Sequence, residues 1–394
     1  MPAPDFDRII DRRGTHCSKW DDMQAAYGVS ADDGLAMWVA DMDFAPPACV
    51  QAAVDRAAAH GVYGYPGANR PYLDAIGWWM QARHGWTIQP DWILTCAGLV
   101  NGVAMALNAF TAPGDGVVVM SPVYHAFGRI VRAGGRRLVE LPLALRDGQY
   151  HMDWQDWETR LDGSERMLIL CSPHNPGGRV WSAEELRAVA DFCKAHDLIL
   201  VSDEIHADLV MPDAPRHVVT ALAAPDIADR LVTLNAATKT FNIAGAHIGQ
   251  AIIADPGLRA RFRDALMAAG ISPAMLGMDM VAAAYSPEGA DWVDALVAYL
   301  DGNRRVFDAA VNAIPGLRSM PLQATYLSWV DFSGTGMAQP EVIARVQGDA
   351  RIAANHGDSF GAGGSGYLRF NLATPRARVQ EAARRLTHAF ADLQ

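Results

Sequence analysis

The sequence NAATKTFNIAG, residues 235–245, contains one lysine, Lys239, and no other charged side chain. The residues before it, RLVTL (230–234), have the apolar and β-branched character of a buried strand. An amine at the end of a core strand must reach water, lose its charge or be bonded to another group, because an unpaired buried charge is costly. The rest of the chain decides among these three explanations.

Short apolar strands alternate with helical patterns through the middle of the chain. The strand-like runs are DGVVVMSP (115–122), RRLVELPL (136–143), RMLILCSPHNP (166–176), DLILVSDEIH (197–206) and RLVTLNAATK (230–239). A helical pattern at 182–197 begins with Ser182 and has Glu185 three residues later, which is a capping box. This alternation predicts an α/β fold with a mostly parallel sheet covered on both faces.

Polar side chains gather where the predicted strands end. Asn175, Asp203 and Lys239 each follow an apolar run, at intervals of 28 and 36 residues. In open α/β sheets, ligands bind at the carboxyl ends of the parallel strands. We therefore expect these three side chains to converge on one crevice.

Length and composition are those of a soluble globular protein. The chain has 394 residues, of which 51% are hydrophobic and 20% charged, and a net charge of −11. No dense basic patch indicates nucleic-acid binding, and the five cysteines suggest neither a metal site nor a disulfide framework. The N-terminus lacks an apolar signal segment, and the longest uncharged run, 92–114, contains polar residues and glycines, so we expect a cytoplasmic protein without a membrane span.

One loop has the glycine pattern of a dinucleotide-binding fingerprint. GAGGSG (361–366) would need a strand before it and a helix after it, whereas the strand-like YLRFNLA (367–373) follows it. We interpret it as a flexible loop near the substrate. The main support for a nicotinamide-dependent oxidoreductase is thereby lost.

The polar residues suit a cationic heteroaromatic ring that carries a phosphate. Asp203 would hold a ring N–H group, Asn175 would donate to a ring oxygen, and Tyr124 would stack on the ring. The glycine turn CAGLVNG (96–102) would offer backbone N–H groups to the phosphate, and Lys239 would form a Schiff base. This set of partners describes pyridoxal 5′-phosphate.

Eight motifs give the chain a resemblance to a known family. They are FDRIIDRRGTHCSKWD (6–21), WVADMDFAPP (38–47), YGYP (63–66), SPVYHAF (121–127), CSPHNPGG (171–178), SDEIH (202–206), TKTFNIAG (238–245) and YLRFNLATPR (367–376). With these motifs the sequence resembles the fold-type I pyridoxal-phosphate enzymes, the aspartate aminotransferase superfamily, over essentially its whole length. WVADMDF together with DEIH resembles the cystathionine β-lyase branch of the MalY and PatB type.

The resemblance implies roles for individual residues. Lys239 and Tyr65 are the implied catalytic residues, and Tyr65, with Tyr63 as a substitute, would reach the other site of a homodimer with shared active sites. The implied cofactor-binding residues are Lys239, Asp203, Asn175, Tyr124, Gly98, Leu99, Thr238, His206 and Tyr65. Arg369 and Ala40 are implied to bind a small amino-acid substrate, and Arg369 would grip its α-carboxylate with a guanidinium fork.

Three departures from the aminotransferase pattern bear on the reaction. His206 stands where a tyrosine is common, His247 where an arginine is common, and Ala236 where a serine is common. The first two favour a carbon–sulfur β-lyase, which would release a thiol, pyruvate and ammonia from L-cystathionine or related cysteine conjugates. The third leaves open how the phosphate is held. An amino-acid aminotransferase is the alternative, and a non-catalytic regulatory protein on the same fold is a third hypothesis.

The sequence pattern changes near residue 286, which predicts a second domain. Residues 48–285 would form a large cofactor-binding domain, to which the resemblance adds a seven-stranded, mostly parallel sheet. Residues 1–47 and 286–394 would form a smaller, discontinuous α/β domain. No nucleic-acid or membrane partner is expected.

Overall fold

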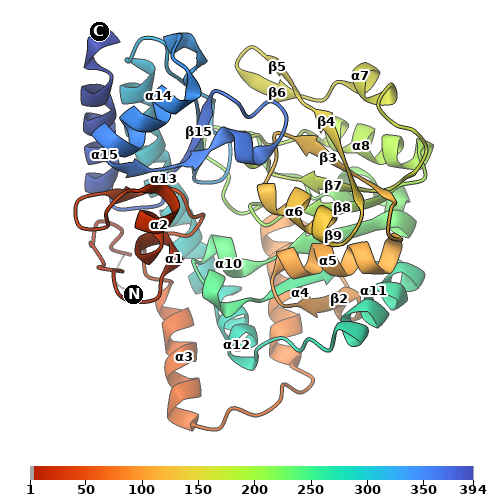
Figure 1. Cartoon of the computed structure of the whole chain (residues 1–394). Coiled ribbons are helices and arrows are strands. Elements are labelled where there is room, and N and C mark those ends of the chain that lie inside the picture. Colours follow the sequence, from red (N-terminus) through yellow and green to blue (C-terminus); the bar gives the residue numbers. More distant parts are fainter. Residues whose placement is uncertain (1–3, 394) are drawn as a thin grey trace.

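The computed structural model describes residues 4–393 and contains a seven-stranded sheet (Figure 1). In spatial order its strands are β2 (Ile93–Cys96), β10 (Gly249–Ile252), β9 (Leu231–Asn235), β8 (Ile199–Asp203), β7 (Glu165–Cys171), β3 (Gly116–Ser121) and β4 (Arg137–Pro142). Within this sheet β10 is antiparallel to both of its neighbours, and the other neighbouring pairs are parallel. The predicted α/β class with a mostly parallel seven-stranded sheet is confirmed.

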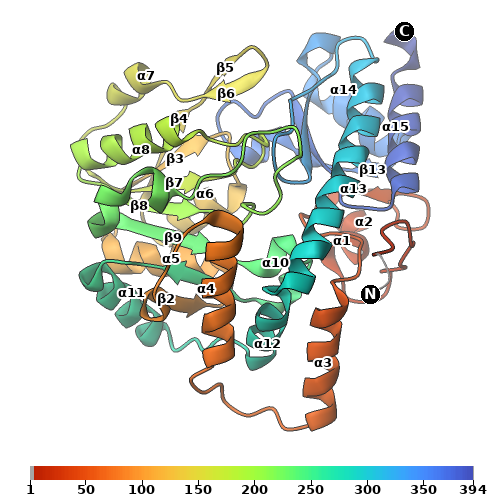
Figure 2. The same ribbon diagram turned by 180° about the vertical axis from the view of Figure 1, so that it is seen from behind.

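Alternate residues of the central strands bury opposite faces of this sheet. On β3, Val117 and Val119 face one layer of helices, whereas Val118 and Met120 face the other. The first layer consists of α5 (Leu99–Phe110), α6 (His125–Ala133) and α11 (Pro256–Ala269), and the second includes α8 (Ala183–Ala195) (Figure 1 and Figure 2). The short helix α9 (Thr220–Ala223) also packs on the second face. Both faces are covered, which explains why the strands are continuously apolar.

A second, antiparallel sheet of four strands lies beside the first (Figure 1). Its order is β11 (Arg318–Ser319), β12 (Leu327–Asp331), β15 (Tyr367–Asn371) and β14 (Asn355–His356), and its helices are α13 (Pro287–Asn312), α14 (Gln339–Ile343) and α15 (Arg376–Ala389). The N-terminal segment joins this region, because β1 (Leu35–Ala36) pairs in parallel with β13 (Ile352–Ala353). Residues 1–3 and 394 of the predicted smaller domain lie outside the described part of the chain.

The remaining elements connect or flank the two sheets. They are α1 (Ser18–Asp21), α2 (Met23–Tyr27), α3 (Ala48–His60), α4 (Arg70–His84), α7 (Trp154–Glu158), α10 (Ala237–Thr240), α12 (Met275–Ala284) and the hairpin of β5 (Ala144–Arg146) with β6 (Gln149–His151). Helix α12 packs against both α3 and α4. Across residues 4–393, no helix has the length and apolar character that crossing a membrane requires.

Two local predictions can be compared with the observed elements. The capping box is present at the start of α8, where the Ser182 side chain and the Glu185 carboxylate each accept from the other's backbone N–H, at 3.2 and 2.9 Å. The strand predicted to reach Lys239 ends earlier, at Asn235, because the chain turns at Ala236 and enters α10. Lys239 therefore lies on a short helix just beyond the strand end.

Candidate active site

The carboxyl ends of four parallel strands lie along one edge of the seven-stranded sheet. Tyr124 follows β3, Asn175 follows β7, Asp203 ends β8, and Lys239 follows β9. Arg369 of β15 closes this edge from the second sheet, since its guanidinium donates to the Asn175 side chain at 3.0 Å. The structure thus brings these five predicted residues together.

The amine of Lys239 is held by a backbone carbonyl. It donates a hydrogen bond to the Ala40 oxygen and, among residues 4–393, has no carboxylate within ion-pair distance. Burial lowers the pKa of Lys239 to about 8 against the raising effect of Asp41 and Asp203, and Arg369 lowers it further. An amine with this pKa loses its proton near neutral pH, as a nucleophile or a general base must.

Asp203 is a buried carboxylate with few partners. It is 6% exposed, and one of its oxygens accepts from the backbone N–H of Ile205 at 3.1 Å. Burial raises the pKa of Asp203 to about 7, although the Ile205 hydrogen bond and Lys239 act in the opposite direction. Such a carboxylate would be stabilised by a cationic N–H group brought by a ligand.

Arg369 is a buried guanidinium without a carboxylate partner in the described chain. It donates to Asn175, to the Trp38 carbonyl and to the Asn355 side chain at 3.0, 3.0 and 2.5 Å, and it lies 4.9 Å from the Phe360 ring centre. Burial lowers the pKa of Arg369 to about 10. A buried guanidinium without a counter-charge is energetically costly, and a carboxylate ligand would lower this cost by forming charge-assisted hydrogen bonds with it.

Two rings border the same space. Tyr124 stands at the start of α6, and burial raises its pKa. Burial lowers the pKa of His206 to about 3, with smaller contributions from Lys239 and Arg369. The Nδ1 atom of His206 is buried and has no hydrogen-bond partner within the described residues. Both rings are therefore uncharged near pH 7.

The N-terminus of α5 is open to a ligand. Gly98 precedes the helix with φ of +83°, and a Cβ atom at this position would meet no atom within 4 Å. No side chain caps the first N–H groups of α5. Leu99 is the first residue of α5, and Thr238 lies in the first turn of α10. Both residues are buried. Free N–H groups at the positive end of a helix suit a phosphate.

These features fit pyridoxal 5′-phosphate. Asp203 has a carboxylate oxygen available for the ring nitrogen, and the Nε of Arg369 and Nδ1 of His206 are buried polar atoms that lack a partner in the described residues. Lys239 offers an amine with a lowered pKa, and α5 offers an uncapped N-terminus. Within residues 4–393, no group of three or more His, Cys, Asp or Glu side chains is arranged to hold a metal ion.

The structure adds a feature that sequence reasoning missed, the 38–43 strap. This segment has no regular secondary structure, yet its carbonyls bind the side chains of the site: Trp38 accepts from Arg369, and Ala40 accepts from Lys239. The Tyr326 hydroxyl also donates to the Ala40 carbonyl, at 3.0 Å. The acidic pair in WVADMDF was the available signal, because two aspartates in an apolar segment require buried partners.

Those partners form an ion cluster behind the strap. The Asp43 carboxylate lies 3.2 Å from Lys19, 3.0 Å from Arg12 and 3.3 Å from Arg378. The amine of Lys19 also donates to the Asp41 carbonyl at 3.1 Å. The strap is therefore fixed on one side by charges and presents its carbonyls on the other.

Tyr65 and Tyr63 lie apart from the other predicted site residues. Their segment, 61–69, projects between α3 and α4, away from α10 (Figure 1 and Figure 2). Tyr65 is 97% exposed and Tyr63 is 70% exposed. In a single chain these side chains do not belong to the pocket around Lys239.

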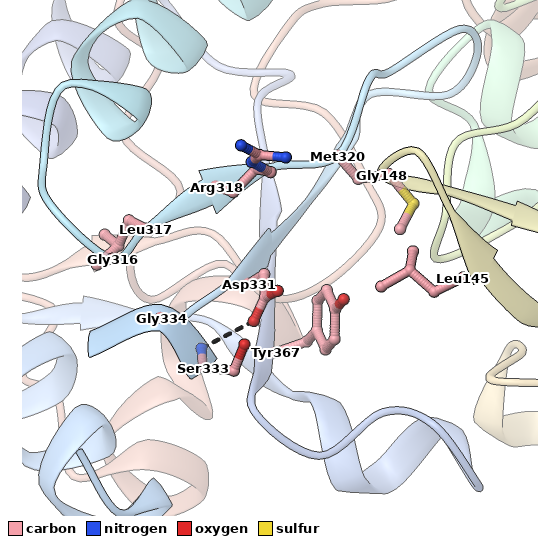
Figure 3. A pocket seen from close by; sticks show the side chains of 10 residues that line it. All are labelled: Leu145, Gly148, Gly316, Leu317, Arg318, Met320, Asp331, Ser333, Gly334 and Tyr367. Carbon is pink, nitrogen blue, oxygen red and sulfur yellow. Dashed lines mark hydrogen bonds between the residues drawn. The ribbon is translucent and has the colours of Figure 1, made fainter. Parts of the chain in front are cut away.

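A separate cavity of about 380 Å³ contains none of the predicted site residues (Figure 3). It lies between the β5–β6 hairpin, which contributes Leu145, and the four-stranded sheet, which contributes Arg318, Asp331 and Tyr367. Asp331 accepts from the backbone N–H of Ser333 at 2.8 Å. The candidate active site is the group of side chains at the strand ends and not this cavity.

Comparisons with known proteins agree with the geometry. The family model described as aminotransferase class I and II matches residues 36–386. The chain is 39% identical to the cystathionine β-lyase PatB of Bacillus subtilis, over 98% of this chain and 99% of PatB. It is 30% identical to the protein MalY of Escherichia coli, over 98% of each chain.

A solved structure extends the likeness to three dimensions. Cystalysin of Treponema denticola, whose crystal structure contains a pyridoxal 5′-phosphate cofactor, matches with a TM-score of 0.94 and 35% identity over the whole of both chains. The family membership predicted from the eight motifs is confirmed. The chain belongs to the class I and II aminotransferase family of enzymes, in the same branch as PatB and MalY.

Proposed function

We propose that the chain is a pyridoxal-phosphate-dependent carbon–sulfur β-lyase. Its substrate would be L-cystathionine or a related cysteine conjugate, and its products a thiol, pyruvate and ammonia. The observation that carries this proposal is the full-length likeness to a cystathionine β-lyase. Lys239, Asp203 and Arg369, which meet at the strand ends, would supply the groups that the reaction needs.

The cofactor, when bound, supplies an electron sink that stabilises negative charge at the substrate Cα. Asp203 would hold it by accepting a hydrogen bond from the ring N–H, and Asn175 would donate to the ring oxygen. Tyr124 would cover one ring face. The N–H groups at the start of α5, after Gly98, would hold the phosphate.

Lys239 would hold the cofactor through its amine and then act as the base for the substrate. Its lowered pKa leaves a substantial neutral fraction near pH 8, so the free amine can take the proton from Cα. Arg369 would bind the α-carboxylate through its guanidinium, whose Nε has no hydrogen-bond partner within the described residues. This contact would orient Cα toward Lys239, which lies on the short helix α10 beyond the end of β9.

We further propose a cytoplasmic homodimer in which Tyr65 of each chain reaches the site of the other. The exposure of the 61–69 segment supports this, because Val62, Tyr63 and Tyr65 together expose apolar surface in one loop, as protein contact sites do. The division into domains at residues 48–285, and at 1–47 with 286–394, remains a proposal that the pairing of β1 with β13 supports.

The test is pyruvate release from L-cystathionine by the cofactor-loaded protein without any keto acid. Pyruvate in many-fold excess over protein is the expected result, and the Lys239→Ala variant is the matched control. Conversion of the cofactor to its pyridoxamine form without pyruvate would favour the alternative, an amino-acid aminotransferase. Absence of both pyruvate and any spectral change with cysteine conjugates would overturn the proposal.

A further inference from the structure

The Ala40 carbonyl accepts hydrogen bonds from two donors. One is the Lys239 amine, and the other is the Tyr326 hydroxyl at 3.0 Å. A carbonyl oxygen has two lone pairs, so both of its acceptor positions are used. The strap itself does not need the tyrosine, because the Asn371 side chain donates to the neighbouring carbonyls of Val39 and Asp41, at 2.6 Å each.

Tyr326 is directed to this carbonyl by an unusual backbone. It is 1% exposed and directly precedes β12. The preceding residue, Thr325, has φ of +73°, which is unfavourable for a β-branched side chain. Two hydrogen bonds maintain this conformation: the Thr325 N–H donates to the Leu209 carbonyl at 2.7 Å, and the Thr325 hydroxyl accepts from the Leu327 N–H at 3.0 Å. Strain of this kind is retained where the surroundings fix a side chain for a purpose.

We propose that Tyr326 is a positioning residue for Lys239. Its hydroxyl and the Ala40 carbonyl form a fixed resting point, from which the lysine amine leaves to react and to which it returns. While the amine is away, Tyr326 keeps the half-buried carbonyl hydrogen-bonded, so departure of the lysine does not leave this acceptor without a protein partner. The inference deepens the proposed function, because it rests on the role given there to Lys239.

The tyrosine also acts on the charge of the lysine. The positive end of its O–H dipole points at the oxygen that the ammonium group shares, and it competes for that oxygen, so it disfavours the protonated amine. The other charged or titratable groups that face Lys239 are Asp41 of the strap, Asp203 at the end of β8, His206 just after this strand, and Arg369 of β15. Removing the hydroxyl leaves these groups in place and should raise the pKa of Lys239.

The test uses the cofactor-free protein and Tyr326→Phe. The chain has only three lysines, Lys19, Lys194 and Lys239, so competitive labelling with acetic anhydride followed by peptide mass spectrometry reports Lys239 separately, with Lys194 as the exposed reference. The wild-type amine should titrate near pH 8. In the variant the acid dissociation constant of Lys239 should fall roughly threefold to tenfold. The acid limb of kcat in the loaded enzyme, in which bound substrate has freed the Lys239 amine, should move to higher pH, with KM changed less than about twofold.

Tyr72→Phe is the matched control. Tyr72 lies on α4 and is buried, and its phenol hydroxyl accepts a hydrogen bond from the Thr95 hydroxyl at 3.3 Å. Removing this hydroxyl should leave the Lys239 titration unchanged. An unchanged Lys239 titration in a folded Tyr326→Phe protein, or an equal shift in the control, would overturn the proposal. The labelling needs no substrate, so it remains decisive even if pyruvate is never formed.

A second measurement covers the case in which Tyr326→Phe does not fold. Site-specific incorporation of 3-fluorotyrosine at position 326 retains the shape and the hydrogen bond but strengthens the donor. The pKa of Lys239 should then fall below the wild-type value. No shift, or a shift upward, would contradict the positioning role.

Discussion

Two lysines contact adjacent carbonyls of the same strap and have opposite environments. Lys239 donates to the carbonyl of Ala40 and has no carboxylate at ion-pair distance in the described chain, whereas Lys19 donates to the carbonyl of Asp41 and lies 3.2 Å from the Asp43 carboxylate. Lys19 is fully buried, whereas Lys239 is partly exposed. The contrast indicates that a nearby carboxylate, more than burial, distinguishes a structural lysine such as Lys19 from a reactive lysine such as Lys239.

The same contrast separates the two regions around the strap. The Asp43 cluster contains a buried carboxylate with cations on several sides, and although burial raises the pKa of Asp43, Lys19 and its other partners hold it at about 2. In the pocket, burial dominates instead, so the pKa of Asp203 is raised and that of Lys239 is lowered. The first region stabilises the fold, and the second leaves charges for a ligand to neutralise.

The largest expected effect follows from Lys239→Met. Pyruvate release should fall at least ~10³-fold, because the variant loses both the bond to the cofactor and the base. The cofactor-free variant should be no less stable than wild type at pH 7. Since the folded pKa of about 8 lies below the ordinary 10.5, the unfolded chain holds the proton more tightly, and wild-type stability should rise between these pH values.

Urea denaturation of both cofactor-free proteins at pH 7 and pH 10 measures this difference. The rise in stability with pH should be smaller in Lys239→Met. A variant that loses more than about 1 kcal/mol at pH 7 would contradict the view that Lys239 is an uncompensated charge.

Lys19→Met should have the next largest effect, on stability instead of activity. Removing one partner from the buried cluster should lower the free energy of unfolding by about 3 kcal/mol, somewhat moderated because Arg12 and Arg378 remain near Asp43. Turnover per folded molecule should stay within about threefold of wild type. A stable but inactive variant would reverse the assignment of the two lysines.

The acid side of the stability curve sharpens this prediction. Asp43 has a folded pKa of about 2, below its ordinary 3.8, so its contribution is complete above pH 4 and is lost as the pH falls toward 2. This loss should be smaller in Lys19→Met, whose Asp43 lacks one cation. Chemical denaturation between pH 5 and pH 2 would measure it.

The smallest effect is expected from the third lysine. Lys194 pairs with Asp226 on the surface, where solvent screens the interaction and Arg187 also contacts the same carboxylate. Lys194→Ala should change the free energy of unfolding by less than about 0.5 kcal/mol and leave pyruvate release unaffected. A loss above about 1 kcal/mol in thermal or urea denaturation would show that the exposure of a lysine does not predict its contribution to the free energy of unfolding.

The alternation of strand-like and helical patterns predicted the fold class, because these patterns are local in the sequence. The parallel strands, the capping box of α8 and the polar residues at strand ends could all be read from short windows of sequence. The strand that runs antiparallel to its neighbours in the seven-stranded sheet, β10, was not predicted, because its residues, GQAI, lie in a glycine- and alanine-rich stretch without a clear period. Tertiary pairing with β2 and β9 sets its direction.

The environment of Lys239 could be predicted only in part. Its place after a strand was visible, but the carbonyl that holds it is 199 positions away, and Tyr326 is 286 positions from that same carbonyl. No local pattern reports such distances. Lys19, likewise, looked like an ordinary charged residue until the fold placed it against Asp43.

The strap is completed by residues from the other end of the chain, which are synthesised last. The carbonyls of Val39 and Asp41 are held by Asn371, and β1 pairs with β13 at residues 352–353. On a ribosome, the first forty residues emerge long before these partners exist. Until about nine-tenths of the chain has been synthesised, the resting place of the lysine amine is unfinished, so competence to take up the cofactor arises only as translation nears its end.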